Sequence, residues 1–231
     1  MTLLAILALG FLLGVRHATD SDHVVTVTTI VARARSPLAA LSVGALWGLG
    51  HSATILMVGG AIVVFGVVIP PRLGLSLELS AAVMLIVLGV LNLLSARAAI
   101  GSAESHPHPH AGKLGAAALG LPSSLRSLCA GVVHGLAGSA AVALLVLASI
   151  KSAHMGLIYL AVFGTGTVVG MMLLTLAMSL PLRALASRFS NAGELMGRVT
   201  GLVSVAFGLF LAYRIGIADG LFFGTPNWDP R

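Results

Sequence analysis

Long apolar stretches are the feature that most constrains how this chain can fold. Of its 231 residues, 58% are hydrophobic and only 9% are charged, whereas about 25% of the residues in a soluble domain are charged. A helix needs about 20 apolar residues to cross the hydrocarbon core of a membrane. The sequence therefore predicts an all-α polytopic membrane protein and argues against a soluble globular enzyme. We expect six spans, at about 2–32, 38–69, 75–96, 125–150, 155–180 and 196–217.

The distribution of basic residues predicts how these spans are oriented. Cytoplasmic loops of membrane proteins carry an excess of Lys and Arg. The loops after the first, third and fifth spans contain eight Lys and Arg residues, against four on the other side. We therefore expect an inner-membrane protein whose termini are periplasmic and whose loop at 98–124 is cytoplasmic. The net charge of +6 is assigned to these loops, and no nucleic-acid partner is expected.

The two halves of the sequence resemble each other. Arg16-His17-Ala18 matches Val133-His134-Gly135 at an offset of 117 residues, and further Gly-containing anchors match at offsets of 116 and 119. Each half has three expected spans, so the second half would be inverted, as in many secondary transporters. The division would be a three-helix repeat at 1–97, the loop 98–124, and a second repeat at 125–231. Chance similarity between Gly-rich membrane segments is the alternative.

A polar cluster interrupts the first apolar span. Between Arg16 and His23 it places two carboxylates, two imidazoles and one guanidinium among apolar residues. An ionisable group at the bilayer centre costs at least about 2.5–3.5 kcal/mol, so such groups are paired, hydrated or functional. Imidazole nitrogen together with carboxylate oxygen is ligand chemistry for divalent transition metals. We therefore predict a metal site with His17, Asp22 and His23 as ligands.

The spacing of these residues has a conformational consequence. On a regular helix Asp22 and His23 lie about 100° apart, and His17 and His23 about 240° apart. The helix must therefore unwind or kink here for all three to meet one ion, unless His17 has a supporting role. Arg16 and Asp20 are four residues apart and can pair on a helix, which would leave Asp22 for the metal.

Other histidines add candidate ligands. His51 follows two glycines that allow close helix approach, so we expect it to reach the cluster with Ser52 nearby; a packed histidine bonded to the backbone is the alternative. His134, the repeat-mate of His17, is either an extra ligand or a supporting residue. The loop histidines capture metal or belong to an extended linker. These are His106, His108 and His110.

The pattern His17, four residues, then Asp22-His23 resembles the signature of the nickel/cobalt transporter superfamily. Leu49-Gly50-His51-Ser52 resembles the next motif of that family, in the following helix. The later acidic motifs of its longer members are absent here, which makes the chain similar to the short, urease-accessory-like branch with about six spans. This resemblance implies that His17, Asp22, His23 and His51 recognise the metal.

From the residues and the resemblance together we expect a secondary transporter, not an enzyme. It would take up a divalent transition-metal ion, Ni²⁺ first and Co²⁺ second, as substrate and without a cofactor. The expected partners are the metal ion and the lipid bilayer, with a nickel chaperone or urease or hydrogenase maturation proteins as further candidates. Two alternatives stay open: an efflux protein that collects metal through its His-rich loop, and an accessory protein that delivers metal without transporting it. The sequence does not predict an oligomeric state.

Overall fold

The fold was obtained as a computed structural model that describes residues 3–31, 36–101, 123–137, 150, 152–188 and 192–228. All secondary structure in these residues is helical, as predicted. The α-helices are α1 (Leu3–His17), α2 (Ser21–Val31), α3 (Pro37–Phe65), α4 (Pro71–Gly101), α6 (Ser123–Gly135), α8 (Ala153–Arg188) and α9 (Ala192–Tyr213), and a π-helical turn, η2 (Arg214–Ala218), follows α9.

Four helices among the described residues, α3, α4, α8 and α9, are each long and apolar enough to cross a membrane. Helices α1 and α2 pass the same test together as a pair bent by 57°, which brings the number to five of the six expected spans if the pair is one broken span. Large apolar side chains on these helices, such as Leu4, Met57 and Leu202, are more than half exposed, as expected for side chains that face lipid. The fourth expected span begins with α6, but residues 138–149 lie outside the described residues, so the number six stays a prediction.

Local sequence signals explain both ends of α3. The Ser36 hydroxyl accepts a hydrogen bond from the Ala39 amide at the start of α3, and Pro37 occupies the first turn, where it removes no helical hydrogen bond. Gly66 ends α3 with a φ of 63°, a conformation that glycine adopts without strain.

The expected end of the fifth span at Pro181 is wrong, because α8 continues to Arg188. A proline inside a helix removes one backbone hydrogen bond, whereas ending the helix within a membrane would leave several backbone groups without partners.

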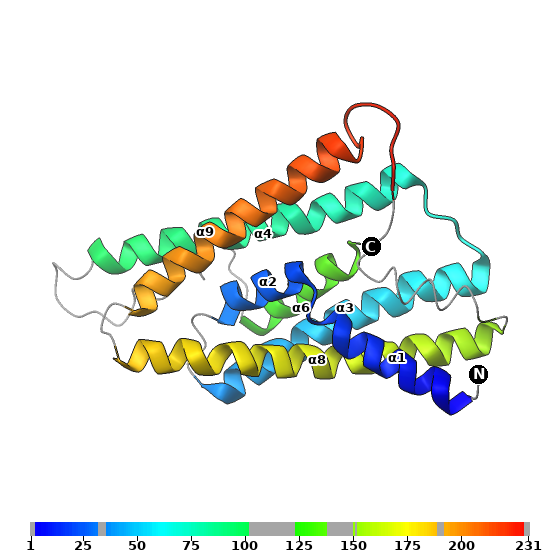
Figure 1. The fold of residues 1–231 in the computed structure, drawn as a ribbon, viewed down its shortest axis with the longest axis horizontal. Helices are drawn as coiled ribbons and strands as arrows, with labels where there is room; N and C mark the ends of the chain where they lie inside the picture. The colour runs from blue at the N-terminus through cyan, green and yellow to red at the C-terminus, as the bar shows by residue number, and fades with distance from the viewer. Residues whose placement is uncertain are drawn as a thin grey trace.

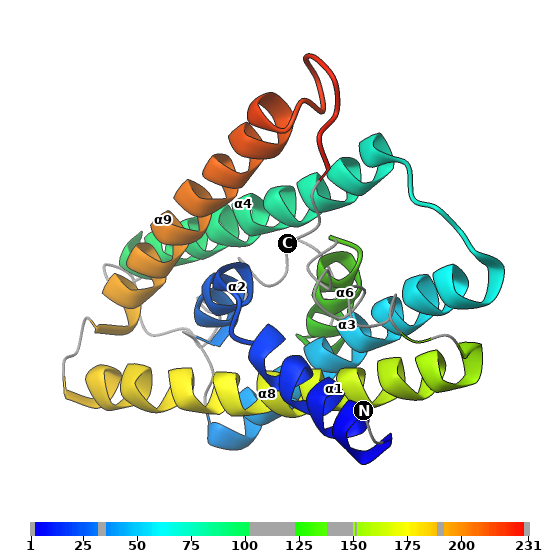
Figure 2. The same cartoon turned by 45° about the vertical axis from the view of Figure 1, so that its right-hand side comes forward.

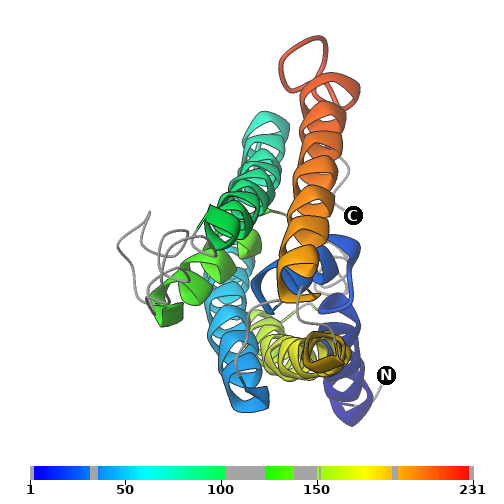
Figure 3. The same cartoon turned by 90° about the vertical axis from the view of Figure 1, so that its left-hand side faces the viewer.

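The helices form two groups with α2 between them. Helices α1, α3, α6 and α8 pack together, with α8 against both α1 and α3, while α4 pairs along its length with α9. Figures 1 and 2 show the α4–α9 pair on one side of α2 and α6, and α1, α3 and α8 on the other. The amide of Asn92 on α4 donates a hydrogen bond of 2.8 Å to the Thr29 carbonyl on α2. The short helix α2 is thus held between the two groups, and the view in Figure 3 shows it beside α9.

Two close glycine contacts connect the first half of the chain to the second half. In one the glycine belongs to the first half, and in the other it belongs to the second half. A Cβ atom at Gly14 on α1 would overlap the carbonyl oxygen of Phe163 on α8, and a Cβ atom at Gly131 on α6 would overlap that of Trp47 on α3. Gly131 and Gly14 are 117 residues apart, and Phe163 and Trp47 are 116 apart. These are the offsets of the internal repeat, so the contacts support our proposal that 1–97 and 125–231 are two copies of one unit.

Candidate metal centre

The polar cluster of the first span lies in a break of the helix, as the sequence predicted. Helix α1 ends at His17 and α2 begins at Ser21. The backbone turns between them, with the Thr19 and Asp20 amides donating to the carbonyls of Arg16 and His17. The Thr19 hydroxyl also donates to the Arg16 carbonyl at 2.6 Å. Side chains that compete for backbone hydrogen bonds in this way interrupt helices, and here the 57° bend lets both histidines of the cluster face inward.

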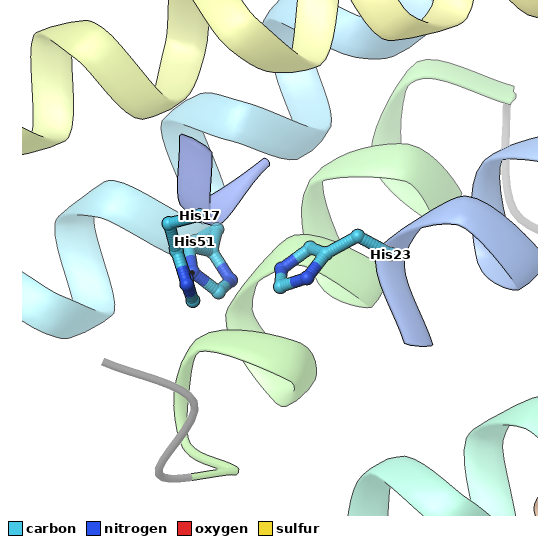
Figure 4. Close-up of side chains that lie close together, drawn as sticks. All are labelled: His17, His23 and His51. Atoms are coloured by element: carbon cyan, nitrogen blue, oxygen red, sulfur yellow. Dashed lines mark hydrogen bonds between the residues drawn. The ribbon is translucent and has the colours of Figure 1, made fainter. Parts of the chain in front are cut away.

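Three imidazoles meet at this break. His17 from the end of α1, His23 from α2 and His51 from α3 each offer one nitrogen, and these atoms all lie within 4.8 Å of one another. The Nε2 atoms of His17 and His51 are 2.9 Å apart, and Figure 4 shows these two rings side by side with the ring of His23 facing them. All three side chains are buried, with exposed fractions of 6%, 0% and 0%. The predicted approach of His51 to the cluster is therefore present.

Asp20 orients His17. Its Oδ2 atom lies 2.9 Å from His17 Nδ1, so a neutral His17 would donate from Nδ1 and keep a lone pair on Nε2. A carboxylate that holds the far nitrogen of a ligand histidine in this way is common around metal ions. The structure corrects the expected pairing of Asp20 with Arg16: Asp20 binds His17 instead, and the Arg16 side chain is exposed. Helix α1 ends at His17, before Asp20, so the four-residue spacing no longer brings the two side chains together.

A second group adjoins the first and shares His23 with it. Asp22, His23 and His134 on α6 also each offer one ligand atom within 4.8 Å of the others. Asp22 Oδ2 lies 2.7 Å from His134 Nε2, and Asp22 Oδ1 lies 3.2 Å from His23 Nδ1. The ring centres of His23 and His134 are 4.5 Å apart. The sequence left the role of His134 open, and the structure brings it into direct contact with Asp22.

Several buried nitrogens of the cluster have no hydrogen-bond partner in the described part of the chain. These are Nε2 and Nδ1 of His23, Nδ1 of His51 and Nδ1 of His134. Buried polar atoms are nearly always hydrogen-bonded, and an exception calls for an explanation such as a bound water or ion. His23 is the extreme case, because it is fully buried and neither of its ring nitrogens makes a hydrogen bond.

A cavity of about 520 Å³ reaches the cluster from the side where α4 begins and α9 ends. Its wall includes one guanidinium, from Arg214, and four carboxylates, from Asp20, Asp22, Glu78 and Asp219. Because the carboxylates outnumber the cation, we call it the acidic cavity. Asp22 is 23% exposed, whereas His23 and His134 beside it are fully buried. The carboxylates of the polar cluster thus stand between the buried imidazoles and the cavity.

The C-terminal segment covers part of the acidic cavity. The indole nitrogen of Trp228 donates to Glu78 Oε1 at 2.8 Å, and Arg214 lies 3.7 Å from Asp219. Glu78, Asp219 and Trp228 are not among the candidate site residues taken from the sequence. No local motif marks these residues, since the cavity forms only where α4, α9 and the last residues of the chain meet.

Comparison with known proteins adds one close relationship. The chain is 36% identical over 220 residues to the urease accessory protein UreH of Bacillus sp. (strain TB-90), a match that spans 95% of this chain and 96% of the relative. The chain belongs to the UreH family of urease accessory proteins. No protein-family model matches the chain, and no solved structure matches it.

Membership of the UreH family confirms the resemblance to the short, urease-accessory-like branch. It also agrees with the expectation that the chain is not an enzyme. The match covers nearly the whole chain, so it includes both the broken first span and the helix that carries His134.

One remaining candidate residue makes its hydrogen bond away from the polar cluster, and the others lie outside the described residues. The Ser52 hydroxyl donates to the Gly164 carbonyl at 2.9 Å, so this side chain joins α3 to α8 instead of supporting a ligand. The expected auxiliary histidines, His106, His108 and His110, lie outside the described residues, and metal capture by the loop stays a prediction.

Proposed function

We propose that this chain is an inner-membrane permease that takes up a divalent transition-metal ion, Ni²⁺ first, through the cluster in its broken first span. The observation that carries the proposal is the meeting of His17, His23 and His51 inside a membrane-spanning protein, with ligand nitrogens within 4.8 Å of one another. Burying three imidazoles is costly when both ring nitrogens of His23 and Nδ1 of His51 make no hydrogen bond in the described part of the chain. A transition-metal ion removes that cost, because it binds the nitrogen lone pairs directly.

The donor set supports Ni²⁺ as the first candidate. Imidazole nitrogen binds divalent first-row metals, and their general affinity order places Ni²⁺ above Co²⁺. In the structure the Nε2 atoms of His17 and His51 share a hydrogen bond of 2.9 Å, so the two nitrogens already face each other. The urease accessory role printed for the relative points the same way, because urease is a nickel enzyme, and Co²⁺ is the second candidate.

The charges of the site suit a dication. Asp22 offers a carboxylate directly, and Asp20 balances charge through His17. A membrane potential contributes about 2.3 kcal/mol per charge and 100 mV, and about twice that for a dication, which is sufficient to drive uptake. Exchange of a proton for the metal at a histidine is the alternative form of coupling. Either would work by alternating access to the cluster from the two sides of the membrane.

The acidic cavity supports uptake as the direction of transport. It lies at the start of α4 and the end of α9, the side on which the Lys and Arg count predicts the exterior. A cavity lined with carboxylates concentrates cations at its mouth. Export, with the loop histidines as the collector, is the competing proposal.

The name of the relative favours a second candidate function. In it the chain delivers metal to urease or hydrogenase maturation proteins, or to a nickel chaperone, without transporting it.

Measuring metal uptake by the purified protein alone distinguishes transport from delivery. Proteoliposomes that contain the wild-type protein and an internal metal-sensitive dye should accumulate Ni²⁺ faster when a potassium diffusion potential makes the interior negative. Empty liposomes and a His17→Ala variant serve as controls. Absence of uptake, with binding retained, would favour the delivery role, and depletion of metal from expressing cells would favour export.

A further inference from the structure

The two ligand groups of the cluster differ in composition and in access. The inner group, His17, His23 and His51, consists of imidazoles alone and is buried. The outer group, Asp22, His23 and His134, contains a carboxylate that lines the acidic cavity. Only His23 belongs to both. One undivided site made of all five side chains would not account for these differences in composition and access between the two groups.

His23 is placed to serve both groups. Its Nδ1 atom lies 3.2 Å from Asp22 Oδ1 in the outer group, while its ring faces His17 and His51 (Figure 4). The centres of the His17, His51 and His134 rings lie 4.8, 5.0 and 4.5 Å from the centre of the His23 ring. Neither nitrogen of His23 makes a hydrogen bond that would hold the ring in one role.

We propose that the metal centre has two overlapping positions, and that the ion passes from one to the other. The ion first binds at the outer position, between Asp22, His23 and His134, and then moves to the inner position, between His17, His23 and His51. His23 stays bound during the exchange, while the outer ligands leave as the inner ones bind. The shared ligand limits the centre to one ion at a time, because a neutral imidazole has a single nitrogen lone pair to offer a metal. This inference rests on the proposed function, since it describes the path of the same ion.

The order of the two positions follows from the acidic cavity. Asp22 and Ala137, which lies just after α6, line the cavity. None of the four histidines lines it, so Asp22 of the outer group is the one ligand of the two groups that faces the cavity. An ion that arrives through the cavity therefore meets the outer position first. Carboxylate oxygen exchanges readily with the hydration shell of a cation, whereas a purely imidazole position selects for a transition metal over Mg²⁺ or Ca²⁺.

The test combines metal binding with uptake. Purified protein in detergent is titrated with Ni²⁺ by equilibrium dialysis, the bound ion is examined by X-ray absorption, and Ni²⁺ uptake is measured in proteoliposomes. The variants are His134→Asn for the outer position, His51→Asn for the inner position and His23→Asn for both. His154→Asn is the matched control, because His154 is an exposed imidazole at the start of α8.

We expect wild type and His154→Asn to bind one Ni²⁺ per chain. The His134→Asn variant should still bind one ion, with imidazole ligands, but its uptake should fall about 10- to 100-fold. The His51→Asn variant should bind one ion with oxygen in its coordination and should not transport it, and His23→Asn should lose specific binding. Should His134→Asn not yield a monodisperse protein, Asp22→Asn takes its place with the same expected result, because the amide nearly matches the carboxylate in size.

Two results would overturn the inference. Equal loss of binding in His134→Asn, His51→Asn and His23→Asn would indicate one undivided site, and wild-type uptake by His134→Asn would place His134 off the path. These results differ from a failure of the proposed function. If the variants show the two-position binding pattern but the wild-type protein shows no uptake, transport is refuted while the two positions stand.

Discussion

Asp22 on α2 and His134 on α6 are 112 positions apart in the sequence, yet Asp22 Oδ2 lies 2.7 Å from His134 Nε2. This contact joins the broken span of the first half to the first helix of the second half. Asp22 also lies beside His23 and lines the acidic cavity. The ligands thus come from three separate segments of the chain, and a change in the relative position of the two halves would change the coordination available to an ion.

Replacing Asp20 with Asn should weaken metal binding without unfolding the protein. The amide keeps the size of the carboxylate but no longer provides a negative charge to hold His17 Nδ1. Loss of such a supporting carboxylate typically lowers metal affinity by about 10- to 100-fold. Equilibrium dialysis with Ni²⁺ checks this prediction, and circular dichroism monitors the fold. Unchanged affinity would show that Asp20 does not orient a ligand.

Acid should slow Ni²⁺ uptake. A histidine binds metal through a lone pair, so each ligand imidazole must be neutral when the ion arrives. Lowering the external pH from neutral therefore opposes binding at either position of the cluster. The initial rate of uptake is measured in proteoliposomes across a series of external pH values, with the membrane potential held constant. Faster uptake in acid would contradict this prediction and would favour coupling to inward proton movement.

Replacing Gly14 with Ala should destabilise the packing of α1 against α8. The added Cβ atom would overlap the Phe163 carbonyl oxygen, and backbone atoms cannot move aside as a flexible side chain can. Overpacking of this kind costs about 1–3 kcal/mol. Thermal unfolding in detergent measures the effect, and Gly60→Ala is the matched control, because its Cβ atom would meet only Leu157 Cδ2 at 3.4 Å. Equal melting temperatures for the two variants would argue against close contact between α1 and α8.

Replacing Glu78 with Gln should raise the KM for Ni²⁺ uptake while leaving the maximal rate unchanged. Glu78 lines the acidic cavity but belongs to neither ligand group, so its charge attracts the ion without binding it at the centre. The effect should shrink as salt is added, because salt screens charges near solvent. Glu194→Gln is the control, since Glu194 pairs with Arg198 at the start of α9 and does not line the cavity. A lower maximal rate with unchanged KM would place Glu78 in a structural role.

Local sequence was sufficient to predict the membrane fold and the break in the first span. Apolar length alone predicts a membrane helix, because lipid leaves the backbone no other way to satisfy its hydrogen bonds. The run from His17 to His23 also predicts its own distortion, since its polar side chains cannot share one face of a regular helix. For the same reason His17, Asp22 and His23 were recognisable as candidate ligands before any tertiary contact was known.

Tertiary structure decided which side chains work together. The contact of His51 with His17, the contact of His134 with Asp22 and the cover that Trp228 forms over Glu78 depend on how separate segments pack. That packing depends on how closely the helix backbones approach each other at positions such as Gly14 and Gly131. The absence of a side chain at these positions decides the contact, and the spacing of apolar residues along the helix does not predict it. Helices that are apolar on most faces carry little information about which face turns inward, so only the assembled fold divides the cluster into two groups that share His23.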